Sequence, residues 1–259
     1  MEVIYNTIGQ GYNATRKADP YIAERLYQLL LPEENGIYLD IGCGTGNYLQ
    51  AMINKGLDMK GIDPSDIMLD AARGKQLNTE LIKAYAHDIP FPKGYFNGAM
   101  AILTIHHWSN RQTGMNELRR VIKPGGRLVF FSFTPQQTMN YWLHHYFPRM
   151  ITQAASIVPT LDEMKDILTE AGFGTTETEL YYTKEDLQDH FMYAHKHKPE
   201  MYLQQEARDG MSAFRLAPDG QEIADGLEKL RTDIASGEIT NIIKKYENDL
   251  GDYLFIVAR

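Results

Sequence analysis

The chain has 259 residues, of which 43% are hydrophobic and 23% charged, as in ordinary globular proteins. Its formal net charge of -8 and the lack of a Lys/Arg run argue against a nucleic-acid partner, which needs a dense basic surface. Cys43 is the only cysteine, which excludes an intrachain disulfide and a cysteine metal cage. The chain shows neither a secretory leader nor an apolar run near the ~20 residues of a membrane helix, so we expect a cytoplasmic protein without membrane contact.

Strands and helices are predicted to alternate between residues 37 and 134. Short apolar runs predict strands over 37–41, 59–63, 97–104 and 127–133. Helical patterns cover 64–74, with Ser65 as the expected N-cap and Gly74 as the expected left-handed C-cap, and 115–122. This alternation is typical of a parallel sheet with right-handed crossovers.

The regular alternation of strands and helices ends after this region. Helices are expected over 136–155 and 161–171, strands over 176–182 and 253–257, and helical patterns over 183–250. We therefore predict a core of residues 1–134, completed by 159–182 and 251–259. Segments 135–158 and 183–250 are then an inserted helical substrate cap.

A glycine-rich turn follows the first predicted strand. Its glycines, Gly42, Gly44 and Gly46, have G-x-G-x-G spacing, whereas dinucleotide enzymes use G-x-G-x-x-G. Asp40, two residues before the first glycine, would repel a pyrophosphate but suits a ligand that carries an ammonium and a sulfonium. Alternatively, Asp40 orders the loop or caps the helix.

Two further acids follow predicted strands. Asp63 ends the second strand, where a carboxylate accepts hydrogen bonds from ribose hydroxyls, or serves as the N-cap of the next helix. Asp88 and Ile89 lie in a loop where the acid could accept from an exocyclic amine and the isoleucine could cover a purine face. A proline-rich surface turn is the alternative for this segment.

Four motifs carry a family resemblance over residues 5–134. In order they are YLDIGCGTG (38–46), GIDPS (61–65), HDIPFP (87–92) and LRRVIKPGGR (118–127). The order and spacing resemble class I S-adenosylmethionine (SAM)-dependent methyltransferases of the small-molecule, type 11 branch. The resemblance implies an α/β fold: a Rossmann-like, seven-stranded, mostly parallel sheet with an antiparallel last strand and helices on both faces. It also implies SAM as cofactor and S-adenosylhomocysteine (SAH) as product.

The resemblance also implies which residues contact the cofactor. They are Tyr12, Arg16, Asp40, Gly42, Cys43, Gly44, Asp63, Pro64, Met68, Asp88, Ile89 and Leu103. Tyr12 and Arg16 belong to a lead segment that folds over the cofactor in many relatives, and Arg16 could bind its carboxylate; a solvated helix is the alternative. Asn97 replaces the aspartate that usually follows the phenylalanine at position 96, and that aspartate is generally structural.

His106 and His107 are the candidate catalytic residues. They follow the fourth strand, at the edge where open α/β sheets bind ligands, and a neutral imidazole there could accept a hydroxyl or amine proton. Alternatively, one caps the loop and the other packs in the wall. No metal is expected, because His190, His195 and His197, within a predicted helix, would place only part of the set on one face.

The predicted function is in-line methyl transfer to an unidentified, small organic acceptor beneath an aromatic cap. A non-catalytic SAM-binding regulatory or partner protein is the alternative, and the glycine spacing and Asp40 disfavour an NAD-dependent oxidoreductase. DNA amino-methyltransferases need Asn/Asp-Pro-Pro-Tyr where residues 104–108 read TIHHW. C5-cytosine and arsenic methylation need a cysteine outside the glycine loop. No pattern indicates the oligomeric state.

Overall fold

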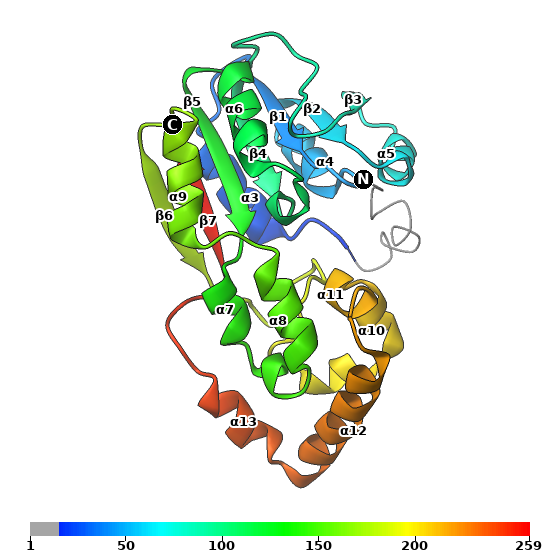
Figure 1. Cartoon of the computed structure of the whole chain (residues 1–259). Helices are drawn as coiled ribbons and strands as arrows, with labels where there is room; N and C mark the ends of the chain where they lie inside the picture. The colour runs from blue at the N-terminus through cyan, green and yellow to red at the C-terminus, as the bar shows by residue number, and fades with distance from the viewer. Residues whose placement is uncertain (1–15) are drawn as a thin grey trace.

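The computed structural model describes residues 16–259, and Tyr12 lies outside this range (Figure 1). One sheet with strand order β3-β2-β1-β4-β5-β7-β6 forms its centre. Its strands are β1 (Ile37–Ile41), β2 (Asp58–Asp63), β3 (Glu80–Lys83), β4 (Phe96–Ile102), β5 (Ile122–Ser132), β6 (Thr176–Tyr181) and β7 (Tyr253–Ala258).

The pairing of the strands confirms the predicted sheet. Strands β1 to β5 pair in parallel, and β7 is antiparallel to both β5 and β6. The order reverses beside β1, because β2 lies on one side of it and β4 on the other. Ligands bind at such a switch point, outside the carboxyl ends of the strands.

Helices cover both faces of the sheet. On one face α3 (Pro20–Leu30) packs on β4 and β5, and α4 (Asn47–Asn54) packs on β2. On the other face α6 (Arg111–Val121) packs on β5 and on α9 (Leu161–Glu170). Because a parallel strand must bury both faces, each layer has its own hydrophobic cluster.

The helix α5 (Asp66–Arg73) tests two predictions about helix ends. Ser65 is its N-cap, and its hydroxyl accepts a hydrogen bond of 3.3 Å from the Met68 backbone N–H, as predicted. The prediction for Gly74 was wrong: it has φ -58 and is right-handed. The right-handed turn continues through Gly74, whose N–H bonds to the Asp70 carbonyl at 3.0 Å, and the left-handed residue is Gln76, with φ 54.

The remaining helices gather beyond the carboxyl ends of β4 and β5 (Figure 1). They are α7 (Pro135–Met139), α8 (Pro148–Ser156), α10 (Gln205–Asp209), α11 (Ser212–Arg215), α12 (Gly220–Ser236) and α13 (Ile239–Lys245), with short 3-10 turns η2 (Trp142–His145) and η3 (Pro199–Leu203). A single hydrophobic cluster joins them to α3, α4 and one face of the sheet. No helix within residues 16–259 is long and apolar enough to cross a bilayer.

Residues 183–198 differ from the prediction of a helix. They form turns and bends, and this segment carries His190, His195 and His197. The helical face on which the metal argument rested therefore does not exist. Tertiary contacts replace the helix: the Trp142 indole N–H donates to the Lys196 carbonyl at 3.2 Å, which holds the turn against η2.

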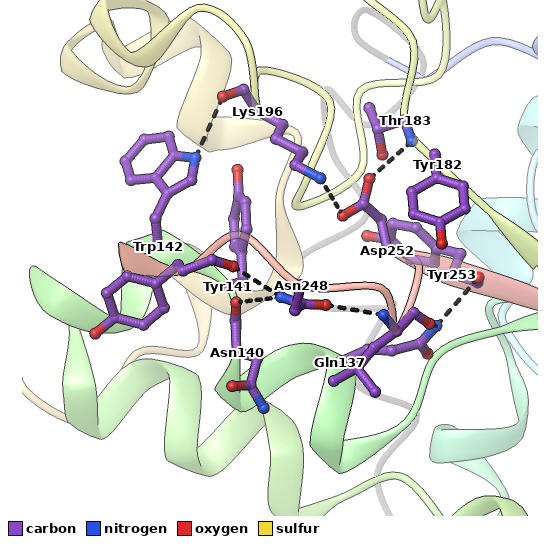
Figure 2. A network of polar contacts seen from close by, with 12 residues as sticks. Gln137, Asn140, Tyr141, Trp142, Tyr182, Thr183, Lys196, Asn248, Asp252 and Tyr253 are labelled. Atoms are coloured by element: carbon purple, nitrogen blue, oxygen red, sulfur yellow. Dashed lines mark hydrogen bonds and ion pairs between the residues drawn. The ribbon is translucent and has the colours of Figure 1, made fainter. Parts of the chain in front are cut away.

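A polar network lies where the chain passes between the sheet and these helices (Figure 2). The Asp252 carboxylate accepts from the Lys196 ammonium at 2.6 Å and from the Thr183 backbone N–H at 2.8 Å. The Gln137 amide donates to the Tyr253 carbonyl at 3.1 Å. Residues just after β5, just after β6 and just before β7 are thus tied together, which fixes how the helical segments leave the sheet.

Candidate cofactor and acceptor site

The glycine loop joins β1 to α4 in a left-handed conformation. Gly42, Gly44 and Gly46 have φ of 69, 53 and 74, values that favour glycine. A Cβ on Gly42 would lie 2.1 Å from the Thr104 hydroxyl oxygen, so the loop and the end of β4 approach each other closely. A Cβ on Gly44 would meet no atom within 4 Å, so the backbone borders empty space there.

Asp63 holds this loop from the neighbouring strand. One carboxylate oxygen accepts from the Gly44 backbone N–H at 2.9 Å, and the other from the Ser65 N–H at 2.8 Å. Ser65, not Asp63, caps α5. Burial raises the pKa of Asp63 to about 6, although both N–H groups act to lower it. The carboxylate therefore links the glycine loop to the turn after β2.

Asp40 is buried without compensation. Its side chain is 2% exposed, and its Oδ1 has no hydrogen-bond partner among the described residues. Burial and the nearby Asp63 carboxylate raise the pKa of Asp40 to about 8. Asp40 does not cap α4, whose N-cap is Gly46, and its Oδ1 receives no loop N–H.

These two acids fit a cationic ligand at the glycine loop. The two carboxyl groups are buried, and Oδ1 of Asp40 has no hydrogen-bond donor among the described residues. An ammonium group close by would lower both pKa values and donate the missing hydrogen bond. The open space beside Gly44 provides room for it. The residues present therefore suit the amino acid end of SAM.

The loop after β3 is held in a way that the sequence did not reveal. The Glu117 carboxylate accepts from the Ile89 backbone N–H at 2.9 Å, and the Arg120 guanidinium donates to the Ile89 carbonyl at 2.7 Å. Asp88 is exposed on this loop. Ile89 and Met68 are each 2% exposed, and Ile89 packs in the cluster under α6, so neither side chain presents an open face to a purine in this conformation.

Arg16 lies in an ion pair that was also unforeseen. Its guanidinium binds the Asp189 carboxylate, which is 1% exposed and also accepts from the Tyr48 hydroxyl at 3.1 Å. The Asn47 amide donates to the Arg16 carbonyl at 3.0 Å. Arg16 is thus anchored to the start of α4, directly after the glycine loop, and to the turn segment at Asp189. The predicted partner for Arg16 was a cofactor carboxylate.

A mainly apolar cavity lies between the strand ends and the helical segments. Leu103, His106 and His107 line it from the segment after β4, where Leu103 has a left-handed φ of 50. Phe133, Met150, Phe191, Met192, Met211, Leu216 and Tyr253 supply most of its apolar wall. Arg16 borders it as well, so the cavity reaches the residues around the glycine loop.

The two histidines both face this cavity. Their ring centroids are 4.0 Å apart, and His106 also lies 5.4 Å from the Phe133 ring. The Nδ1 atom of His106 is buried without a partner among residues 16–259. Burial lowers the pKa of His107 to about 4 and, with repulsion from His107 as a smaller cause, lowers that of His106 well below its usual value. Both imidazoles are therefore neutral near pH 7.

A family model described as a methyltransferase domain matches residues 39–130. A solved structure from Anabaena variabilis, described as a methyltransferase from an antibiotic biosynthesis pathway, is 32% identical and superposes with a TM-score of 0.84 over 95% of this chain and 99% of that one. The chain belongs to the class I SAM-dependent methyltransferases. The family predicted from the sequence motifs is therefore confirmed.

Curated relatives of this methyltransferase act on different acceptors. A mouse tRNA (carboxymethyluridine(34)-5-O)-methyltransferase is 33% identical over 138 residues, which is 52% of this chain and 20% of that protein. A demethylmenaquinone methyltransferase of Tropheryma whipplei is 26% identical over 176 residues, 65% of this chain and 74% of that protein. The chain thus spans one fifth of the mouse relative, and the relatives do not agree on an acceptor. Residues 16–259 contain no cluster of His, Cys, Asp or Glu that could hold a metal ion.

Proposed function

We propose that this methyltransferase transfers the methyl group of SAM to a small, mainly apolar molecule held in the cavity between the strand ends and segments 135–158 and 183–250. The cavity carries this proposal: its wall is mostly apolar, it includes His106 and His107, and it adjoins Arg16 near the glycine loop. When bound, SAM supplies an activated methyl group on a sulfonium. The chain's own task is to hold the acceptor atom in line with that methyl and to exclude water.

The cofactor end of the site is proposed from the same geometry. Asp40 receives the ammonium of the cofactor, and the Gly42–Gly46 backbone with Cys43 lies along its methionine part. Asp63 keeps its bond to the Gly44 N–H and accepts from the ribose. Pro64 borders the ribose side, Asp88 accepts from the exocyclic amine, and Leu103 supplies its carbonyl at the end of β4.

A tRNA acceptor is the competing possibility raised by the mouse relative. The net charge of -8 disfavours it, because tRNA binding relies on a basic surface. The cavity disfavours it as well, since its lining contains one arginine and no lysine among the described residues.

The direct test measures SAM binding and SAH release. Isothermal titration with SAM and with NAD establishes the cofactor, and SAH release is then followed with fractions of small metabolites and with total tRNA. We expect SAM to bind, NAD not to bind, and a small-molecule fraction to support turnover. Binding of NAD without SAM would overturn the cofactor assignment, and SAH release with tRNA alone would overturn the acceptor class.

The histidines are tested once a productive fraction is known. His106→Phe and His107→Phe each keep a ring but lose the proton acceptor, so a base role predicts a fall in turnover of about 100-fold for the residue that holds it. If both variants keep the wild-type turnover at saturating acceptor, neither histidine takes part in the chemistry.

A further inference from the structure

A segment of turns and bends forms part of the cavity wall. Phe191 and Met192, which line the cavity, lie in this segment, residues 183–198, and both side chains are buried. Neither residue is held by the hydrogen-bond pattern of a helix or a strand. Their position therefore depends on contacts that the segment makes with other parts of the chain.

Asp189, two residues before Phe191, anchors the segment through a buried carboxylate. The side chain is 1% exposed, and it accepts from both Nε and Nη2 of the Arg16 guanidinium, from Nη2 at 3.2 Å. The Tyr48 hydroxyl donates to the same carboxylate at 3.1 Å. Burial raises the pKa of Tyr48 well above its usual value, so this hydroxyl stays protonated and remains a donor.

The preceding residue, Gln188, reinforces this anchor. Its backbone N–H donates to the Asp19 carboxylate at 3.2 Å, and Asp19 is the N-cap of α3. The Asp19 backbone N–H in turn donates to the Tyr48 hydroxyl oxygen at 3.4 Å. The lead into α3, the start of α4 and the turn segment therefore meet in one hydrogen-bonded cluster.

This cluster lies beside the glycine loop. Tyr48 is the second residue of α4, and Gly46, the last glycine of the loop, is the N-cap of that helix. The Asn47 amide donates to the Arg16 carbonyl at 3.0 Å, so the first residue of α4 also holds Arg16, which borders the cavity. The cluster thus connects the loop at the proposed cofactor end with the wall at the proposed acceptor end.

A buried carboxylate fixes the position of its segment more strictly than an apolar contact does. Apolar contacts are non-directional, whereas a carboxylate that leaves its partners must either be rehydrated or stay buried without compensation. The guanidinium of Arg16 binds Asp189 through two N–H groups, which fixes the direction of the pair as well. The turn at Asp189 therefore has one favourable location, and Phe191 and Met192 follow from it because they are two and three residues away.

We infer that Asp189 is a positioning residue of this methyltransferase, which sets the wall formed by Phe191 and Met192 at a fixed place relative to the glycine loop. This inference rests on the proposed function. Methyl transfer requires the acceptor atom in line with the methyl group, and a misplacement of about 1 Å can cost about 100-fold in rate. Asp189 is outside the described lining of the cavity, so it acts through Arg16 and the two wall residues.

Turnover of Asp189→Asn tests this role, because asparagine keeps the shape of the side chain but loses the charge that pairs with Arg16. SAH release is followed with the small-metabolite fraction that supports the wild-type enzyme, at a temperature where circular dichroism shows each variant folded. We expect kcat to fall about 100-fold while the KM for SAM changes by less than about threefold. Asp186→Asn is the matched control, because this exposed aspartate of the same segment should leave both values unchanged.

A second measurement reports the position of the wall without turnover. The NMR signal of the isotope-labelled Met192 methyl group in the SAH-bound protein, assigned by its loss in Met192→Leu, should shift in Asp189→Asn and stay in place in Asp186→Asn. The signal of Met115, which packs in the other hydrophobic cluster, should stay in place in both variants. A general loss of stability would not move one methionine signal selectively in the folded protein.

Wild-type kcat in Asp189→Asn, or an unshifted Met192 signal, would overturn the inference, and so would a KM for SAM that rises as far as kcat falls. If Asp189→Asn does not fold, Tyr48→Phe keeps the buried ring and removes one donor to Asp189, and its kcat should fall about tenfold with the same KM for SAM. Full kcat in Tyr48→Phe would then contradict the positioning role. Wild-type protein that releases no SAH with any small-metabolite fraction would refute the proposed function itself, and the inference with it.

Discussion

Replacing Asp40 with asparagine should stabilise the ligand-free protein while abolishing its affinity for SAM. Asp40 is buried, and its pKa rises from 3.8 to about 8 on folding. A carboxyl whose folded pKa exceeds the unfolded value stabilises the fold at low pH, and this contribution is lost as pH rises toward the folded pKa. Asparagine has the same shape and does not titrate, so the Asp40→Asn variant escapes that loss.

The magnitude follows from the proton count. Between pH 6 and pH 7.5 the unfolded chain has released the Asp40 proton and the folded chain still holds it, so stability falls by about 1.4 kcal/mol per pH unit. The advantage of the variant over wild type should therefore grow by about 2 kcal/mol across this range. Asp63, with a pKa of about 6, has already lost most of its own pH-dependent contribution to stability at pH 6, where this window begins.

Urea denaturation at the two pH values measures this difference directly. Thermal unfolding should show the same trend as a gap in Tm that widens by about 4–8 °C. A constant difference between variant and wild type from pH 6 to pH 7.5 would refute the buried, protonated state of Asp40. A variant that still binds SAM with wild-type affinity would refute the ammonium contact.

The same reasoning predicts proton release when SAM binds to wild type. The ammonium lowers the pKa of Asp40, so about one proton should leave the protein at pH 7. Calorimetry in phosphate and in Tris, which differ in ionisation enthalpy, should give apparent binding enthalpies that differ accordingly. The Asp40→Asn protein is the control, and identical wild-type enthalpies in both buffers would contradict the mechanism.

Three other substitutions extend these tests. Asp63→Ala removes the acceptor of the Gly44 and Ser65 N–H groups and should weaken SAM binding about 10- to 100-fold, with an unchanged circular dichroism spectrum. Unaltered affinity in calorimetry would exclude Asp63 from the site. Gly44→Ala, at φ 53 with open space around the added methyl, should cost about 1 kcal/mol of stability in urea but reduce SAM affinity more than tenfold, whereas full affinity would mean that no ligand approaches this loop. Asp189→Asn should lower the free energy of unfolding by about 3 kcal/mol. The double variant with Arg16→Gln should lose less than the sum of the two single losses, and a strictly additive loss would rule out coupling through the ion pair.

Much of the sheet and the cofactor end of the site could be predicted from local pattern. Strand β1 was predicted with its observed bounds, because a short apolar run before glycines reads as a buried strand wherever it lies in the fold. The placement of Asp63 at the end of β2 also followed, since the second apolar run stops at that residue. Neither inference required knowledge of contacts between distant segments.

The acceptor end depended on tertiary structure. Asp189 binds Arg16 across 173 positions of sequence, and no local period marks such a partner. The turns at 183–198 replaced an expected helix because the Asp252 carboxylate and the Trp142 indole hold that segment from elsewhere in the chain. A cavity likewise exists only where several segments face one another, so its mainly apolar lining became visible only in the folded chain. Periodicity reports what each segment buries, whereas its partner depends on packing between segments far apart in sequence.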